Sequence, residues 1–146
     1  MLSFELLCFI EQRPRAQLKV LQISPNSSFV ALGQPLKLNV TVTVNVTDGR
    51  FHRRDDIHIR WSFRRFSSTS FEELTMNKWR LYRDRAYRVY PYSYNSRASI
   101  VNTATLVLAN TTLNDTGTYQ CYVASRRFWF YWRSQRLYFN VTIEGR

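Results

Sequence analysis

The chain has 146 residues, of which 45% are hydrophobic and 16% aromatic, and it carries a formal net charge of +11. With four prolines and four glycines, this composition excludes a largely disordered chain and is sufficient for the core of one domain. Two cysteines exclude a disulfide framework, and without a CxxC or Cys/His cluster we expect no metal centre or other cofactor. The positive charge leaves nucleic acid, an anionic glycan, a membrane surface or an acidic protein as candidate partners.

Residues 1–15 form an apolar leader. The apolar run has the length of a signal peptide, but Glu5 interrupts it and no basic residue precedes it. We expect either a degraded or partial signal peptide or an ordinary first strand, followed by a single domain over residues 16–146. No run of about 18 apolar residues predicts a transmembrane helix. Because the chain stops soon after its last predicted strand, we expect it to be part of a longer protein, and membrane attachment would need a downstream segment.

Alternation of apolar and polar residues predicts strands along the whole chain. In residues 35–46 every second residue from Leu36 to Val46 is apolar, as a strand with one buried face requires. Residues 83–97 are predicted to form one or two irregular edge strands broken at Pro91. Many short strands separated by turn residues predict a β-sandwich or barrel. The other predicted strands span residues 18–23, 57–63, 78–82, 103–108, 118–124 and 136–143.

Six of the nine asparagines lie in N-x-S/T sequons, far more than chance predicts. Such an excess indicates the secretory pathway, and therefore an extracellular or cell-surface location with N-linked glycans. Threonine-rich strands that create sequons by accident are the alternative. The six candidates are Asn26, Asn39, Asn45, Asn110, Asn114 and Asn140.

Residues 106–123, LVLANTTLNDTGTYQCYV, resemble the E strand, E–F corner and F strand of immunoglobulin-superfamily domains. The family pattern D-x-G-x-Y-x-C is present as Asp115, Gly117, Tyr119 and Cys121. The resemblance implies a tyrosine corner, in which the Tyr119 hydroxyl binds upstream backbone. It also implies that Gly117 supplies backbone freedom in this tight corner.

Three further stretches extend the resemblance over roughly residues 16–144. GQPLKLNV, residues 33–40, resembles the start of strand B, and Trp61 resembles the core tryptophan of strand C. SRASI, residues 96–100, is similar to the start of strand D, which implies an ion pair between Arg97 and Asp115. The gap between Trp61 and Arg97 leaves room for strands C′ and C″. The resemblance therefore implies an all-β, two-sheet antiparallel Greek-key β-sandwich of the immunoglobulin-like variable (V-set) type.

The chain departs from the family pattern at strand B, where Val40 occupies the position of the first cysteine. The B–F disulfide is therefore absent, a loss that usually costs about 2–5 kcal/mol in small secreted domains. We expect Val40, Trp61 and Cys121 to pack together instead. Three states of Cys121 remain open, namely a free buried thiol, a bridge to Cys8 and an intermolecular bond.

The stretch SRRFWFYWRSQ, residues 125–135, is the strongest candidate for ligand binding. A pleated strand buries only alternate residues, so several of its five consecutive aromatics must be exposed or cover one another. Exposed tryptophan, tyrosine and arginine are typical of binding hot spots. A bulged hairpin with its aromatics folded back on the sheet is the alternative. The predicted ligand-binding residues are Arg126, Arg127, Phe128, Trp129, Phe130, Tyr131, Trp132 and Arg133, with Trp79 and Tyr82.

Charge and sequons are unevenly distributed. Of 21 lysines and arginines, 12 lie in residues 50–97 and four in residues 126–136, whereas residues 48–109 contain no sequon. By the resemblance, glycans would lie on the A-B-E-D sheet and at the end opposite the F–G loop. The C′-C-F-G face would then be bare, basic and aromatic.

No catalytic pattern such as G-x-S-x-G is present, and we expect no enzymatic activity. The histidines and acids of residues 52–58 (His52, Asp55, Asp56 and His58) could hold a metal ion, but such a loop cluster is usually solvated, so no metal site is predicted.

We therefore expect an extracellular recognition or adhesion domain that binds a protein, on another cell or as a second copy of itself, through the C′-C-F-G face. A second hypothesis is an anionic-glycan binder, for example of heparan sulfate. Nucleic-acid binding is a weaker hypothesis, although basic patches with aromatic residues also fit it. The sequons indicate the secretory pathway, where nucleic acid is not the expected ligand. A secreted immune decoy, host or viral, is a further alternative. The arginines that would hold a sulfated glycan are Arg53, Arg54, Arg64, Arg65, Arg83 and Arg85.

Overall fold

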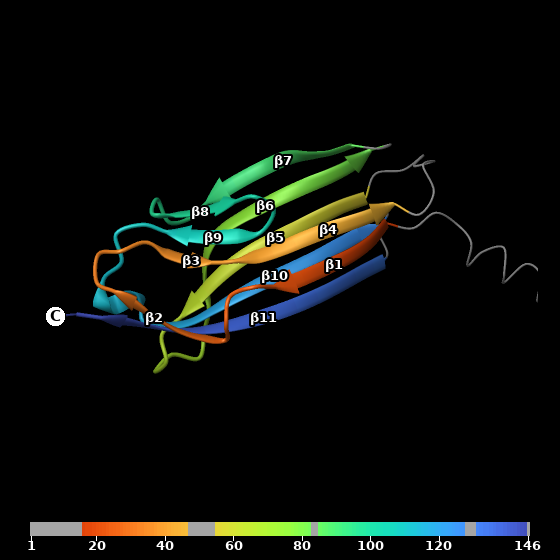
Figure 1. Cartoon of the computed structure of the whole chain (residues 1–146). Helices are drawn as coiled ribbons and strands as arrows, with labels where there is room; N and C mark the ends of the chain where they lie inside the picture. Colours follow the sequence, from red (N-terminus) through yellow and green to blue (C-terminus); the bar gives the residue numbers. More distant parts are fainter. Residues whose placement is uncertain (1–15, 47–54, 83–84, 128–130, 146) are drawn as a thin grey trace, which may run out of the picture.

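The computed structural model describes residues 16–46, 55–82, 85–127 and 131–145, which form two facing layers of β-sheet (Figure 1). Within these residues no helix is long and apolar enough to cross a membrane. The elements are β1 (Ala16–Gln22), β2 (Ser27–Ala31), β3 (Leu36–Leu38), β4 (Val40–Val46), β5 (Asp55–Arg64), β6 (Glu72–Tyr82), β7 (Arg85–Ser93), β8 (Ala98–Val101), β9 (Thr105–Leu108), the short 3₁₀-helix η1 (Leu113–Asp115), β10 (Gly117–Arg127) and β11 (Tyr131–Glu144).

One layer is a six-stranded sheet with the order β2-β11-β10-β5-β6-β7. The other layer contains the sheet β3-β9-β8 and the pair β1-β4. All pairs are antiparallel except β2 with β11, which is parallel. The strands β5, β6, β7, β10 and β11 take the places expected of C, C′, C″, F and G. The predicted all-β sandwich of the variable immunoglobulin type is confirmed.

The long strand predicted over residues 35–46 is two strands, divided at Asn39. β3 pairs with β9, whereas β4 pairs with β1. At the break the Asn39 amide donates to Ser24 Oγ at 2.7 Å, and its carbonyl accepts the Ile23 amide at 3.0 Å. The Val42 amide then donates to Thr103 Oγ1 at 3.0 Å. The strand therefore changes partner while Leu36, Leu38, Val40 and Val42 all face the core.

Strand β7 lies at the edge of the six-stranded sheet, as predicted for this segment. The break expected at Pro91 is wrong, because β7 continues through Pro91, which lies opposite Asn77. An edge strand tolerates proline, which lacks an amide hydrogen, when that side of the strand faces no neighbour. The register of β6 and β7 shifts between Lys78 and Trp79.

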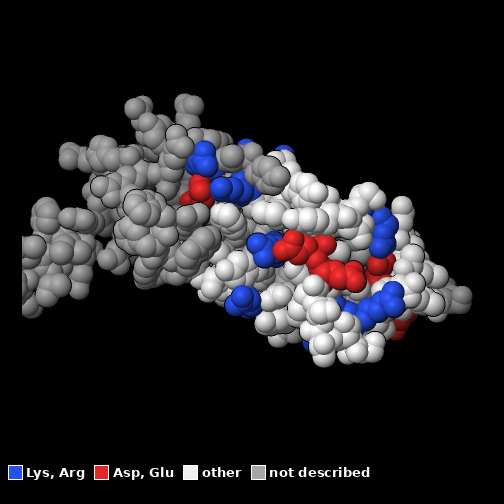
Figure 2. All heavy atoms as spheres, turned by 180° about the vertical axis from the view of Figure 1, so that it is seen from behind, with Lys and Arg blue, Asp and Glu red and all other residues white. Residues whose placement is uncertain are grey.

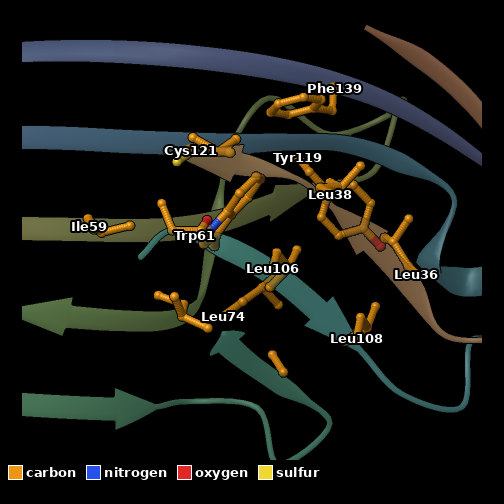
Figure 3. Packing of buried hydrophobic residues seen from close by; sticks show 14 of the residues in the cluster. Leu36, Leu38, Ile59, Trp61, Leu74, Leu106, Leu108, Tyr119, Cys121 and Phe139 are labelled. Atoms are coloured by element: carbon orange, nitrogen blue, oxygen red, sulfur yellow. Dashed lines mark hydrogen bonds between the residues drawn. The ribbon is translucent and has the colours of Figure 1, made fainter. Parts of the chain in front are cut away.

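The core is built around Trp61, which is fully buried between the layers (Figure 3). Its indole Nε1 donates to the Ala104 carbonyl at 2.8 Å, and its ring lies 5.5 Å from that of Phe139. Cys121 lies opposite Trp61 in the β10–β5 ladder and is a free, fully buried thiol. Burial raises the pKa of Cys121 to about 12. Val40 is fully buried in the same cluster, while Cys8 lies outside the described residues.

Candidate functional site

The expected E–F corner, which includes η1, precedes β10 and anchors the start of that strand. The Arg97 guanidinium donates to both carboxylate oxygens of Asp115, at 2.8 and 2.9 Å, so the expected ion pair is present and bidentate. The Tyr119 hydroxyl donates to the Asp115 carbonyl oxygen at 2.6 Å, as in a tyrosine corner. Burial alone would raise the pKa of Asp115, but hydrogen bonds from Arg97 and Thr112 hold it below its ordinary value. This network fixes where β10 enters the sheet.

Gly117 has a different role from the one expected. Its φ is not positive; among the described glycines only Gly33 has a positive φ, of 85°. A Cβ at Gly117 would collide with the carbonyl oxygen of Arg64 and lie 2.7 Å from Cε2 of Phe63. Glycine is therefore needed because β10 begins against the end of β5, and not for backbone freedom.

The alternation of β10 presents one row of side chains to the core and another to the outer face of the six-stranded sheet. Tyr119, Cys121 and Val123 are buried, whereas Gln120 and Tyr122 are partly accessible on the other side. Neighbouring strands supply the residues beside this second row. Together they surround a hollow of about 430 Å³ lined by His58, Arg60 and Ser62 of β5, Gln120 and Tyr122 of β10, and Arg136 of β11.

Tyr122 is at the centre of this hollow, between two guanidinium groups. The Arg136 guanidinium carbon lies 4.7 Å from the centre of the Tyr122 ring, and that of Arg60 lies 5.8 Å from it. Both distances are within the range of cation–π attraction. Further along the face, Gln120 Nε2 donates to the Tyr138 hydroxyl at 3.4 Å, so these side chains form one connected surface.

The outer face carries both signs of charge. Arg60 pairs with Glu73 at 3.1 Å, and Asp56 pairs with Lys78 at 3.4 Å and Arg80 at 3.2 Å. Figure 2 shows basic and acidic side chains beside one another, and the described residues form no continuous basic area on the face that it shows. The C′-C-F-G face is therefore less uniformly basic than the positions of arginine in the sequence imply.

The described part of the predicted aromatic stretch lies at the far end of the same hairpin. In the β10–β11 ladder Arg126 pairs with Trp132 and Arg127 with Tyr131, while residues 128–130 lie outside the described residues. Arg133 pairs with Ser125 in the same ladder. The structure thus places the backbone of five predicted residues together at one end of the outer sheet.

The two other predicted ligand-binding residues lie on β6. Trp79 pairs with Ile57, whose side chain is buried, and Trp79 is itself partly buried against the core. It therefore faces the interior of the sandwich and not the outer face. Tyr82 is the last residue of β6 and pairs with Arg85 of β7.

The candidate glycosylation sites are not all on the opposite layer. Asn140 is exposed and lies opposite Thr118, whose hydroxyl donates to its Oδ1 at 2.9 Å. It shares the outer face with Gln120 and Tyr138, at the end of β11 away from the β10–β11 turn. Asn140 therefore lies at the end of the G strand opposite the F–G loop, as expected, but it stands on the outer face, which we expected to be bare. Of the others, Asn26, Asn110 and Asn114 are exposed, Asn39 is half-buried and Asn45 lies on β4.

The described residues contain no group of three or more His, Cys, Asp or Glu side chains that could hold a metal ion. His52 lies outside them, and Asp56 is engaged by Lys78 and Arg80.

Sequence reasoning missed the hollow on the outer face. The signal was present in residues 57–63, IHIRWSF, where the apolar residues that face the core alternate with His58, Arg60 and Ser62. The hollow exists because the β5–β10 and β10–β11 ladders bring these residues beside Tyr122 and Arg136. The sequence of a single segment does not predict this cross-strand pairing.

Comparison with known proteins agrees with this architecture. The immunoglobulin V-set domain model matches residues 23–140. The chain is similar to domain 1 of VCBP3 from Branchiostoma floridae, with 17% identity over 88% of this chain and 96% of that chain and a TM-score of 0.65. It is similar to murine CRIg, with 10% identity over 89% and 98% of the two chains and a TM-score of 0.59.

A third similar structure is that of the extracellular domains of the voltage-gated sodium channel beta4 subunit. Its identity is 14% over 86% of this chain and 98% of that chain, with a TM-score of 0.54. That work describes parallel homodimers that explain a role in cell–cell adhesion. At these identities the likeness shows the fold. No curated protein sequence matches the chain significantly.

Proposed function

The chain belongs to the immunoglobulin V-set family, and from this premise we propose that it is the recognition or adhesion domain of an extracellular glycoprotein. V-set domains are non-catalytic binding domains that are generally extracellular or on the cell surface. The proposed partner is a protein, held by the outer face of the six-stranded sheet and the β10–β11 turn.

The observation that carries this proposal is the arrangement around Tyr122. An aromatic ring between Arg60 and Arg136, in a hollow on an accessible sheet face, has the composition of an interface hot spot. The sheet itself is a rigid platform, since β10 is anchored at its start by Arg97, Asp115 and Tyr119. The aromatic and arginine residues of the turn would extend the contact beyond the hollow.

The sequons are compatible with binding at the centre of this face. Asn26 precedes β2, Asn39 and Asn45 belong to the opposite layer, and Asn110 and Asn114 lie near η1. Asn140 stands on the outer face, but at the end away from the turn. Glycans at these positions would restrict a partner to the hollow and the turn.

A second copy of the chain and a different protein are both allowed as the partner. The adhesive homodimers described for the sodium channel beta4 subunit provide a precedent for the first, in a protein of the same fold. A sulfated glycan is less favoured, because Arg60, Lys78 and Arg80 are already paired with Glu73 and Asp56.

We expect the double substitution Trp129→Ala and Trp132→Ala to abolish binding of a fluorescent tetramer of the chain to cells that the unaltered tetramer stains. Tryptophan at an interface often contributes about 2 kcal/mol or more to binding. Because the tetramer binds through several sites at once, the loss of affinity at each site lowers its overall avidity further. The control is Lys37→Ala with Ser99→Ala, two exposed residues of the opposite layer. Undiminished staining by the tryptophan variant, with its thermal unfolding unchanged, would contradict a role for the turn.

A further inference from the structure

We infer that the hollow around Tyr122 receives an acidic side chain, Asp or Glu, of the protein partner. The inference rests on the proposed function and adds that the protein partner must present a carboxylate to this hollow. The lining residues named for the hollow supply two guanidinium groups, an imidazole, a hydroxyl, an amide and a phenol, and no carboxylate.

Arg136 is the group best placed to bind a carboxylate. It is exposed, and no carboxylate of the described residues lies within 4.0 Å of its guanidinium nitrogens. Its guanidinium carbon lies 4.7 Å from the centre of the Tyr122 ring, and this cation–π contact holds the exposed side chain against the sheet. A planar guanidinium offers two parallel N–H donors to a carboxylate, so an ordered and unpaired arginine is a prepared carboxylate site.

Arg60 provides a second positive charge beside the Tyr122 ring. Its Nη1 is paired with Glu73 at 3.1 Å, but its Nε is buried without a hydrogen-bond partner. Because this Nε is inaccessible, Arg60 contributes its positive charge to the hollow and not a free donor. Ser62, which is 6% exposed, lies among the same lining residues as a further donor.

The surrounding charges favour one carboxylate over a polyanion. Glu73 lies next to the hollow through its pair with Arg60, and Asp56 lies further along the same face, beside Lys78 and Arg80. A sulfated chain crossing this face would meet both acids, whereas a single side chain inserted beside Arg136 would not. Repulsion between the sulfate groups and the carboxylates of Glu73 and Asp56 would oppose binding of a sulfated chain.

The test uses the full ¹⁵N-labelled chain and two small probes of equal shape, N-acetyl-glutamate methylamide and its neutral analogue N-acetyl-glutamine methylamide. We expect only the acidic probe to cause saturable shifts of the Arg136 Nε–H and Gln120 side-chain amide signals. Arg136→Gln should weaken its binding by about tenfold or more, as loss of a charge-assisted hydrogen bond predicts. The matched control Lys37→Gln, on the opposite layer, should bind as the unaltered chain does.

Equal responses to the two probes, no response to either, or unchanged binding by Arg136→Gln would overturn the inference. A heparin tetrasaccharide that displaces the acidic probe from these residues and binds more tightly would overturn the assignment to a protein side chain. The probe titration needs no partner, so it can fail while the cell-binding test of the tryptophan variants succeeds, and the reverse is equally possible.

Discussion

Replacing Gly117 by alanine is expected to lower the free energy of unfolding by about 3 kcal/mol or more, the upper range for overpacking a tight site. The added Cβ would collide with the backbone carbonyl of Arg64 and approach the Phe63 ring to 2.7 Å. Backbone cannot rotate away as a flexible side chain can, so β10 would have to move from β5. Urea unfolding followed by tryptophan fluorescence would measure the change.

Gly33→Ala is the matched control for this experiment. Gly33 has a φ of 85° but no atom within 4 Å of the position of a Cβ. Its substitution should therefore cost only the conformational penalty, roughly 1–2 kcal/mol. A smaller loss for Gly117→Ala than for Gly33→Ala would contradict the close approach of β5 and β10.

Replacing Val40 by cysteine is expected to restore a disulfide with Cys121 when the chain is secreted. Both positions are fully buried in one cluster with Trp61, and they belong to strands of the two facing layers. The bridge would close a loop of roughly 80 residues, for which chain entropy predicts a stabilisation of up to about 4 kcal/mol. Unfolding in urea with and without reductant would measure it.

Val42→Cys is the control, because Val42 is buried on the same side of β4 but one pleat further along the strand. Thiol titration in denaturant should find Cys121 oxidised in the Val40→Cys variant and free in the Val42→Cys variant. In the unaltered native chain Cys121 should resist thiol reagents near pH 8, because a pKa of about 12 leaves almost no thiolate. A Cys121 that stays free in Val40→Cys, or that is already oxidised in the unaltered chain, would contradict this packing.

The parts of the fold that could be predicted from sequence depend on local patterns. Arg97 and Tyr119 each contact Asp115, as the resemblance of residues 96–100 and 106–123 to immunoglobulin domains implied. The division of residues 35–46 at Asn39 was not predictable, since the apolar alternation continues through it. The strand changes partner because β3 pairs with β9 and β4 with β1, and the break between them is held by hydrogen bonds to Ser24 and Thr103, which are distant in sequence.

The candidate site was less predictable than the fold. Runs of arginine in the sequence implied a basic face, but cross-strand pairs with Glu73 and Asp56 neutralise much of its described part. Strand register also decides that Trp79 faces inward and that Asn140 stands on the outer face. Such placements depend on which residues become neighbours across a ladder, and one-dimensional patterns do not contain that information.

A glycan introduced onto the outer face tests the proposed recognition surface most directly. Arg136→Asn with Tyr138→Thr creates an N-x-T sequon beside the hollow, and Ser99→Asn with Val101→Thr creates one on exposed positions of β8 in the opposite layer. With both variants secreted, glycosylated and folded, the first tetramer should lose cell staining and the second should stain as the unaltered chain does. Staining that survives the glycan beside the hollow, or that is lost only with the glycan on β8, would contradict the account.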